Sequence, residues 1–431
     1  MDFQSAYKQG NEALKAKDFK EAQRLFQLAL NFKPNDIYSM NKLAMVLKEL
    51  GDFEGAKKLL DGSLQVKKED LYTNYLLGNT YLEEGDIAKA ILTLEKTVEK
   101  NPSDKYARNS LALAYKMNGE YSKCIELLKK ALEYDPSDLY NKLSLATSLF
   151  ELGDIPEATK YAGEIARKDP RNISANILLG RIEIEKANFS GAQGFFNTVL
   201  SIDANNSDAH YYIGRICLEI SSQEEAREHF NSALAVAEDK ASILKNLGMI
   251  YMDREDFQQA EEHFAMAINL EEDAPTLSNM GKLLVMQGRH EEAIENLKRA
   301  IEIQSDYAFA YYNLAKAYQD IRDFPNAIYN LMFALNYEPD DVYAINVLGR
   351  MFLEVGLNDR ALRTFQQVID EFDVNDKFAL FGKAEALTAM GRFNQAQEVL
   401  MNLRNIAAKT DKNMLNKIDD KLTKLKREMN A

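Results

Sequence analysis

The sequence predicts an all-α protein in which helical hairpins follow one another as a solenoid. Three observations predict this fold class. Landmark residues recur at a constant interval along most of the chain, and two positions in each period carry a small residue. A large apolar residue follows the second small residue by four positions in most periods, which is the spacing of one helix face. Because 431 residues exceed the usual size of a single globular core, a repeat array is the expected way to bury this apolar surface.

We divide the chain from Phe3 into consecutive windows of equal length, beginning with 3–36 and 37–70. The first small residue is the eighth residue of each window. A one-residue deletion near Asp273 and a one-residue insertion near Asp376 interrupt the register, which then resumes. A large apolar residue directly precedes most of these small residues, as Leu43 precedes Ala44. The eighth-place residues are Gly10, Ala44, Gly78, Ala112, Ala146, Gly180, Gly214, Gly248, Gly281, Ala315, Gly349 and Ala384.

The second small position is the twentieth of each window. Its residues are Ala22, Ala56, Ala90, Cys124, Ala158, Ala192, Ala226, Ala260, Ala293, Ala327, Ala361 and Ala396. Two small positions let the backbones of two antiparallel helices approach closely, because a larger side chain would wedge them apart. Each window therefore predicts one helical hairpin.

The turn inside each hairpin is marked by Gly-Asp-Phe or a variant of it, as at Gly51. The glycine is expected to close the first helix, and Asp52 to cap the second. Pro156 and Pro325 stand where the first turn of the second helix is expected, a place at which a missing N–H costs nothing.

The windows define twelve repeats, and a helical tail follows them. The predicted repeat boundaries are 3–36, 37–70, 71–104, 105–138, 139–172, 173–206, 207–240, 241–273, 274–307, 308–341, 342–376 and 377–410. Residues 411–431 carry Leu415, Ile418, Leu422, Leu425 and Met429 on one helical stripe. This stripe predicts a C-terminal capping helix for the last hairpin. A partner-binding or coiled-coil tail is the alternative.

The order of these landmarks, Leu-Gly/Ala, Tyr, Ala, Phe and Pro, resembles the tetratricopeptide repeat (TPR) family, and the resemblance covers residues 3–410. The large aromatic residue that often opens the family motif is missing, and Met40, Asn74 and Arg108 stand there instead. The resemblance implies a right-handed superhelix of twelve helix-turn-helix repeats. It also implies a concave groove lined by the first helix of each hairpin, at about the second, fifth, sixth, ninth and twelfth places.

Aromatic residues recur at the second of these groove places. They are Tyr38, Tyr72, Tyr106 and Tyr140 in repeats 2 to 5, and Phe309, Tyr343 and Phe378 in repeats 10 to 12. One interpretation is that each ring packs on the preceding hairpin and sets the pitch of the array. The other is that the tyrosines form a partly wet contact surface for a partner, where tyrosine is favoured.

Asparagines occupy the sixth place of repeats 8, 9 and 10, namely Asn246, Asn279 and Asn313. A side-chain amide can both donate to and accept from an extended peptide backbone, so it can hold a peptide without sequence preference. This set is similar to the asparagine ladder by which the repeat superhelix of O-GlcNAc transferases holds peptides. The alternative is that asparagine is common at this place in the family.

Basic residues occupy the ninth place of several repeats, one helical turn from the sixth. They are Arg181, Arg215, Lys282, Lys316 and Arg350. A row of cations beside the amides predicts an acidic or carboxylate-bearing partner segment. The alternative is that each cation pairs with a nearby acid, since acids often stand four positions along the same helix, namely Glu185, Glu219, Asp320 and Glu354.

Composition and motifs narrow the function classes. The net charge of −14 opposes general binding to nucleic acid. Phosphate-binding loops, zinc-protease motifs and paired-cysteine metal spacings do not occur, so the chain is not expected to be an enzyme and neither a cofactor nor a metal is expected. Cys124 and Cys217 fall at apolar helix positions and are expected in the core.

The expected function is a protein–protein interaction scaffold that binds an extended, acidic partner segment in its groove and helps to assemble a multiprotein complex. The alternative is a self-assembling structural protein, a homo-oligomer that uses its terminal repeats or C-terminal helix. Without a long run of apolar residues or an apolar leader, direct membrane insertion is not expected. The chain is expected to be cytoplasmic, although a protein trimmed of a secretory signal would look the same.

Overall fold

The computed structural model describes residues 1–407 and 412–429, and this part of the chain is all-α, with 25 α-helices, one π-helix and no strand. The chain divides into two compact units, Met1–Ile216 and Cys217–Ala431, called here the N-terminal and C-terminal units. Their boundary falls inside helix α13 (Ser207–Glu219). The predicted fold class, an all-α solenoid of hairpins, is confirmed within each unit.

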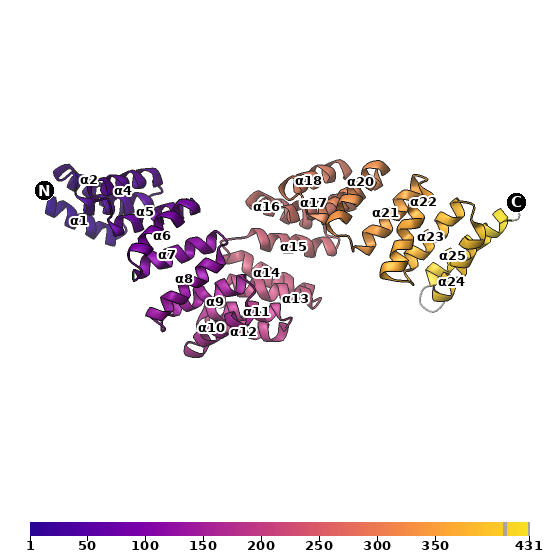
Figure 1. Cartoon of the computed structure of the whole chain (residues 1–431), viewed down its shortest axis with the longest axis horizontal. Helices are drawn as coiled ribbons and strands as arrows, with labels where there is room; N and C mark the ends of the chain where they lie inside the picture. The colour runs from indigo at the N-terminus through magenta and orange to yellow at the C-terminus, as the bar shows by residue number, and fades with distance from the viewer. Residues whose placement is uncertain (408–411, 430–431) are drawn as a thin grey trace. The chain divides into compact units, whose positions relative to one another are not determined.

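The N-terminal unit is a stack of helices in chain order, and each helix packs on the next along the chain (Figure 1). Its helices are α1 (Phe3–Lys15), α2 (Phe19–Phe32), α3 (Ile37–Glu49), α4 (Phe53–Val66), α5 (Leu71–Glu84), α6 (Ile87–Lys100), α7 (Lys105–Met117), α8 (Tyr121–Tyr134), α9 (Leu139–Glu151), α10 (Ile155–Lys168), α11 (Ile173–Glu185) and α12 (Phe189–Ile202). Odd-numbered helices are the first helices of hairpins, and even-numbered helices are the second.

The C-terminal unit continues the same alternation. Its helices are α14 (Gln223–Val236), α15 (Ala241–Asp253), α16 (Phe257–Leu270), α17 (Ala274–Met286), α18 (His290–Ile303), α19 (Ala308–Asp320), α20 (Phe324–Tyr337), α21 (Val342–Glu354), α22 (Asn358–Gln367), the π-helix η1 (Val368–Phe372), α23 (Lys377–Ala389), α24 (Phe393–Ala407) and α25 (Lys412–Met429). The exact repeat limits stay a prediction, and the limit between residues 410 and 411 lies outside the described residues.

The turns form as the Gly-Asp signal predicts. Gly51 has a φ of +81°, a left-handed conformation that glycine adopts without a Cβ penalty. The next residue, Asp52, caps α4 by accepting a hydrogen bond from the Gly55 N–H at 2.9 Å. Where the glycine is replaced, as by Lys17 or Arg322, the residue still adopts a φ near +60°. The turn geometry is therefore kept even where its preferred residue is absent.

The small positions bring the two helices of each hairpin together. Ala56 and Leu60 of α4 are fully buried. A Cβ at Gly78 would lie 2.6 Å from Leu94 Cγ of α6, so a side chain larger than hydrogen would force these helices apart. Cys124 and Cys217 are buried, as expected, and burial raises the pKa of both thiols.

The two breaks in the repeat register have different structural outcomes. The deletion shortens the connection between α16 and α17 to residues 271–273. The corresponding connections earlier in the chain, 33–36 and 67–70, are one residue longer. The insertion is absorbed upstream of Asp376, inside η1. There the Asp373 N–H donates to the Val368 carbonyl oxygen at 3.0 Å, five positions back, whereas the Glu338 N–H at the end of α20 reaches back four positions to Ala334. The extra residue therefore widens one helical turn.

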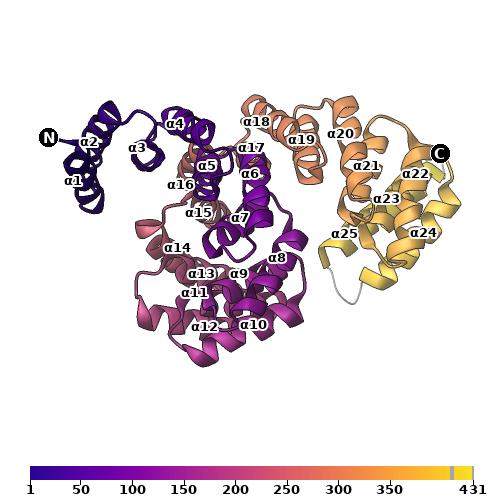
Figure 2. The same ribbon diagram turned by 60° about the vertical axis from the view of Figure 1, so that its left-hand side comes forward.

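Helix α25 covers the last hairpin, as the apolar stripe of the tail predicts (Figure 2). Ile418 and Leu425 are buried in the same core as α23 and α24. The Arg404 guanidinium of α24 pairs with the Asp419 carboxylate of α25 at 2.6 Å. Met429, the last residue of the stripe, is 39% exposed. None of the helices in the described ranges is long and apolar enough to cross a membrane.

Candidate peptide-binding surfaces

The second-place aromatic residues of the N-terminal unit are surface residues. Tyr38, Tyr72, Tyr106 and Tyr140 are 66%, 47%, 71% and 54% exposed. Tyr72 is the least exposed of the four, and its hydroxyl lies 3.6 Å from Met45 Sδ of the preceding first helix. A residue that sets the pitch by packing would be mostly covered, so the exposure favours the contact-surface interpretation for Tyr38 and Tyr106 in particular.

Tyr75, a fifth-place residue outside the predicted set, links two of these rings. The Tyr75 ring centroid lies 6.2 Å from that of Tyr72 and 6.5 Å from that of Tyr106. Together the three rings line a cleft of about 290 Å³ over α3, α5 and α7, with Met45 and Asn79. The signal was present in the sequence, because Tyr75 follows Tyr72 by three positions and so shares its helix face.

The same meeting of a fifth-place ring with the second-place ring of the next repeat recurs in the C-terminal unit. The ring centroids of Tyr312 and Tyr343 lie 5.8 Å apart. Burial is the largest cause that raises the pKa of the Tyr312 phenol, and a hydrogen bond with Tyr343 is the next. Burial also raises the pKa of the Tyr72 phenol. Both phenols therefore stay neutral at pH 7 and can donate a hydrogen bond. Phe309 is half-buried, whereas Tyr343 and Phe378 are 63% and 72% exposed.

The three sixth-place asparagines differ in how their amides are used. Asn246 Nδ2 donates to the Ser242 carbonyl, and Asn313 Nδ2 donates to the Phe309 carbonyl, each at 2.8 Å. Asn313 is only 5% exposed. Asn279 is half-buried and makes no hydrogen bond within the described residues. Of the predicted ladder, Asn279 is therefore the member whose donor and acceptor are both free.

Asn279 lines a cleft of about 610 Å³ on the first helices of the C-terminal unit. Lys245 and Met249 come from α15, Asn279 from α17, and the aromatic pair Tyr312 and Tyr343 from α19 and α21. The structure thus brings together residues from the second, fifth, sixth and ninth places of neighbouring repeats, the places expected to line a groove. An apolar cleft with few polar groups is typical of a binding site.

Two of the five ninth-place cations, Arg181 and Arg350, pair with a nearby acid, but the acid belongs to a neighbouring hairpin and not to the same helix. Arg181 instead crosses to the preceding hairpin, where its Nη2 lies 3.0 Å from Glu151 Oε1 and its guanidinium lies 4.6 Å from the Phe150 ring centroid. Arg181 and Arg215 both line a cleft of about 620 Å³ in the N-terminal unit. Tyr212 lines the same cleft. Arg215 has no ion pair among the described residues.

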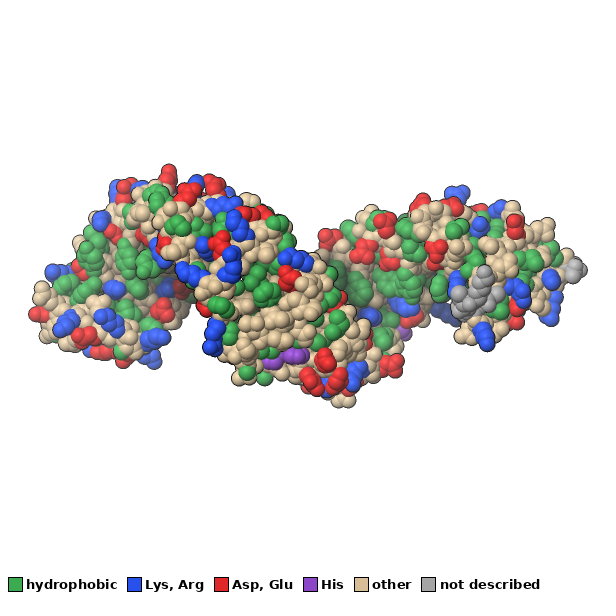
Figure 3. Space-filling view, turned by 90° about the horizontal axis from the view of Figure 1, so that it is seen from below, with side chains coloured by type: hydrophobic (Ala, Val, Ile, Leu, Met, Phe, Trp, Pro, Cys, Tyr) green, Lys and Arg blue, Asp and Glu red, His purple; other side chains and the backbone are tan. Residues whose placement is uncertain are grey.

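In the C-terminal unit the ninth-place cations divide into paired and unpaired residues. Arg350 pairs with Glu385 of the following first helix, and Glu385 also contacts Lys421 of α25 at 3.3 Å. Lys282 and Lys316 form no ion pair within residues 1–407 and 412–429. Basic and acidic side chains are interspersed over the face shown in Figure 3, with no large field of one charge.

The described residues contain no group of three or more His, Cys, Asp or Glu side chains arranged to hold a metal ion. The clefts on the first helices are lined by aromatic, amide and basic side chains. Such side chains suit recognition of a peptide by stacking, backbone hydrogen bonds and charge.

Family models of tetratricopeptide repeats match four stretches of this chain, residues 37–69, 149–216, 224–278 and 281–321. A model of anaphase-promoting complex, cyclosome, subunit 3 matches residues 83–165. Among curated protein sequences, no significant match was found.

Solved structures show the same fold at low sequence identity. A chain in the crystal structure of the APC/C hetero-tetramer Cut9–Hcn1 matches with a TM-score of 0.53 and 15% identity, over 88% of this chain and 95% of that chain. A tetratricopeptide repeat protein from Parabacteroides merdae matches with a TM-score of 0.51 and 16% identity, over 57% of this chain and 98% of that chain. From its repeat register, its hairpins and these matches, the chain is a member of the tetratricopeptide repeat family.

Proposed function

We propose that this protein is an interaction scaffold that binds an extended segment of a partner protein along the first helices of hairpins from α15 to α21. The observation that carries the proposal is the cleft around Asn279, which this free amide lines together with the aromatic pair Tyr312 and Tyr343. The amide can bond a peptide backbone, and the rings can cover an apolar side chain.

The unpaired lysines favour an acidic segment. Lys282 and Lys316 follow Asn279 and Asn313 by three positions, so they lie on the same helix face as the amides. Placing a carboxylate beside them adds a charge-assisted bond without breaking an existing ion pair. Glu338 and Asp341, which line the cleft, carry the opposite charge. The acidic part of the segment is therefore proposed to lie beside Lys282 and Lys316.

Assembly of a multiprotein complex is part of the proposal, because Cut9–Hcn1, which shares the fold, is a hetero-tetramer. End-to-end self-assembly through the C-terminal face has less support. Ile418 and Leu425 of the chain's own helix α25 already cover the apolar surface of the last hairpin.

The test is a pull-down with cross-linking mass spectrometry that compares the wild type with the triple variant Asn279→Ala, Lys282→Ser, Lys316→Ser. A matched control, Lys240→Ser with Lys298→Ser, removes the same charge at exposed positions outside the cleft. The cross-linker is photo-reactive and does not depend on lysine, because the variant removes the lysines of α17 and α19. We expect the triple variant to lose partner segments that cross-link to these two helices, and the control to keep them. If both variants keep or lose the same segments, the cleft is not the binding site.

A further inference from the structure

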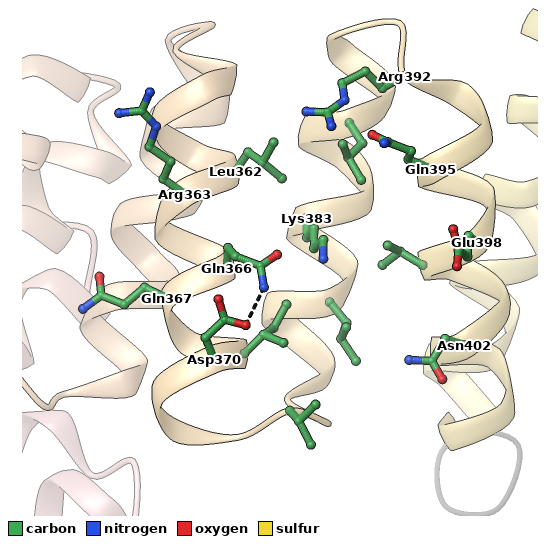
Figure 4. A pocket seen from close by; sticks show the side chains of 15 residues that line it. Leu362, Arg363, Gln366, Gln367, Asp370, Lys383, Arg392, Gln395, Glu398 and Asn402 are labelled. Carbon is green, nitrogen blue, oxygen red and sulfur yellow. Dashed lines mark hydrogen bonds between the residues drawn. The ribbon is translucent and has the colours of Figure 1, made fainter.

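A second cleft, of about 830 Å³, lies among α22, η1, α23 and α24 (Figure 4). Its lining includes Leu380 and Leu387 of α23, with Leu362 of α22 and Val399 of α24 on either side. On α23, Leu380, Lys383 and Leu387 follow one helix face. At about 100° per residue this face is roughly opposite to the one that carries Phe378 and Glu385, the second and ninth places. This cleft is therefore separate from the surface that the proposed function uses.

Lys383 breaks the repeat pattern at this cleft. It occupies the seventh place, which is a large apolar residue in every window except the first and this last one. Its counterparts are buried, for example Leu145 and Leu247, whose side chains are fully covered. Lys383 is half-buried and lines the open cleft. A charged residue at a core position is costly and marks a site where the usual packing has been given up.

The widened turn of η1 stands at the same cleft. Ile369 and Asp370 of η1 line it, and so does Val374, which follows η1 and is 64% exposed. Wide turns of this kind arise where one residue is inserted into a helix, and they occur often at functional sites. The two irregularities of the last repeats, the extra residue and the lysine, thus meet in one place.

The basic side chains of the cleft are unpaired. Arg363, Lys383 and Arg392 line it, and none of them forms an ion pair within the described part of the chain. Arg363 of α22 and Arg392, at the turn between α23 and α24, lie toward the same end of the cleft (Figure 4). Asp370 already accepts a hydrogen bond from the Gln366 amide at 2.6 Å. Glu398 is the other acid of the lining.

We propose that this cleft binds a carboxylate-bearing segment of a partner protein. Apolar side chains of the segment pack on Leu380 and Leu387, and its carboxylates lie near Arg363, Lys383 and Arg392. Guanidinium groups bind carboxylates through paired hydrogen bonds, and the lysine adds a point charge. A phosphate dianion fits less well, because Asp370 and Glu398 would repel it more strongly than a single carboxylate. The wall from Arg392 to Asn402 is about 15 Å long, which two to three turns of a helical segment would fill.

The test selects peptides of about twelve residues from a random phage library on the full-length wild type, after depletion on the variant Arg363→Gln, Lys383→Leu, Arg392→Gln. Leucine at position 383 is the residue type found at this place in other repeats, so the variant is expected to fold. Selected peptides are then synthesised with their Asp and Glu residues intact or changed to Asn and Gln. Their affinities are measured by fluorescence anisotropy, with circular dichroism as the check on folding.

We expect the selected peptides to be enriched in Asp and Glu, to bind the cleft variant about tenfold or more weakly, and to lose a similar factor in their amide forms. The groove variant Asn279→Ala, Lys282→Ser, Lys316→Ser should bind them as the wild type does, which separates this proposal from the proposed function. Should the triple cleft variant misfold, the exposed pair Arg363→Gln, Arg392→Gln provides the same comparison.

Three results would overturn the proposal. Depletion could leave no peptides that distinguish the two proteins. The selected peptides could lack acidic residues. Finally, the wild type could dimerise in a way that the cleft variant abolishes, in which case a second copy of this chain is the occupant.

Discussion

The Phe365 ring of α22 lies directly on the backbone of Gly382 in α23. A Cβ at Gly382 would overlap Phe365 Cζ, and one at Gly349 of α21 would lie 2.7 Å from Phe365 Cε1. The ring is therefore held between two glycines, one from its own hairpin and one from the next. This contact couples the last two repeats, because neither helix can move toward the ring.

The first prediction is that Gly382→Ala destabilises the last repeats. The added methyl group forces the Phe365 ring or α23 to move, and overpacking of this kind costs about 1 to 3 kcal/mol in the free energy of unfolding. Hydrogen–deuterium exchange should be faster in α21 to α24. Gly194→Ala is the control, because a Cβ at this exposed helical glycine meets nothing within 4 Å. It should stabilise α12 by about 0.5 to 1 kcal/mol through the helix propensity of alanine.

The second prediction separates the two interpretations of the tyrosine row. Tyr106→Ala should change the free energy of unfolding by about 0.5 kcal/mol or less, because its side chain is 71% exposed. Tyr75→Ala should cost about 2 kcal/mol, because Tyr75 packs against two buried apolar clusters. Thermal melts of the two variants provide the measurement. Equal losses would mean that the exposed row also serves packing.

Much of the fold could be predicted from the sequence, because the hairpins depend on local rules. Spacing along one helix predicts which face is buried, and Gly-Asp predicts a turn and a cap whatever lies nearby. Asp154, the acid of another Gly-Asp turn, caps α10, and Pro156 lies in the first turn of that helix, as expected. The apolar stripe of the tail likewise predicted that Ile418 and Leu425 would be buried.

The sites were less predictable, because their contacts cross between hairpins. Arg181 pairs with Glu151 at the end of the preceding first helix, α9, rather than with Glu185 on its own helix. The choice depends on how two hairpins are spaced, which the periodicity of one helix does not encode. The register revealed an extra residue but not that a widened turn would absorb it before Asp376, beside Lys383.

The third prediction concerns acid stability and the cap of α5. Burial disfavours the Asp70 carboxylate, but hydrogen bonds from Lys67 and Thr73 outweigh it and lower the pKa of Asp70. The native state therefore binds this proton less readily than the unfolded chain, whose Asp pKa is about 3.9. The resulting stability is present above about pH 4 and is lost as the pH falls through the lowered native value.

Asp70→Ala should accordingly cost about 1 kcal/mol at pH 7 and less at about pH 2 to 3. Asn172→Ala removes the cap of α11, which accepts from the Ala175 N–H at 3.0 Å and does not titrate. Its cost should stay at about 1 kcal/mol at every pH. Urea unfolding across this pH range provides the comparison. A pH-independent difference for Asp70→Ala would show that its cap acts without its charge.

The fourth prediction is that Lys383→Leu makes the last repeats more stable. Residues at this place in other repeats are buried, so leucine is expected to pack here against Leu380 and Leu387. The free energy of unfolding should rise by about 1 kcal/mol. Residues kept for binding commonly lower stability in this way. Lys298→Leu, at an exposed position of α18, is the control and should change stability by about 0.5 kcal/mol or less. Thermal melts and exchange rates in α22 to α24 measure both variants. A loss of stability in Lys383→Leu would mean that the lysine stem already fills its place, so the cleft would have no packing defect for a partner to occupy.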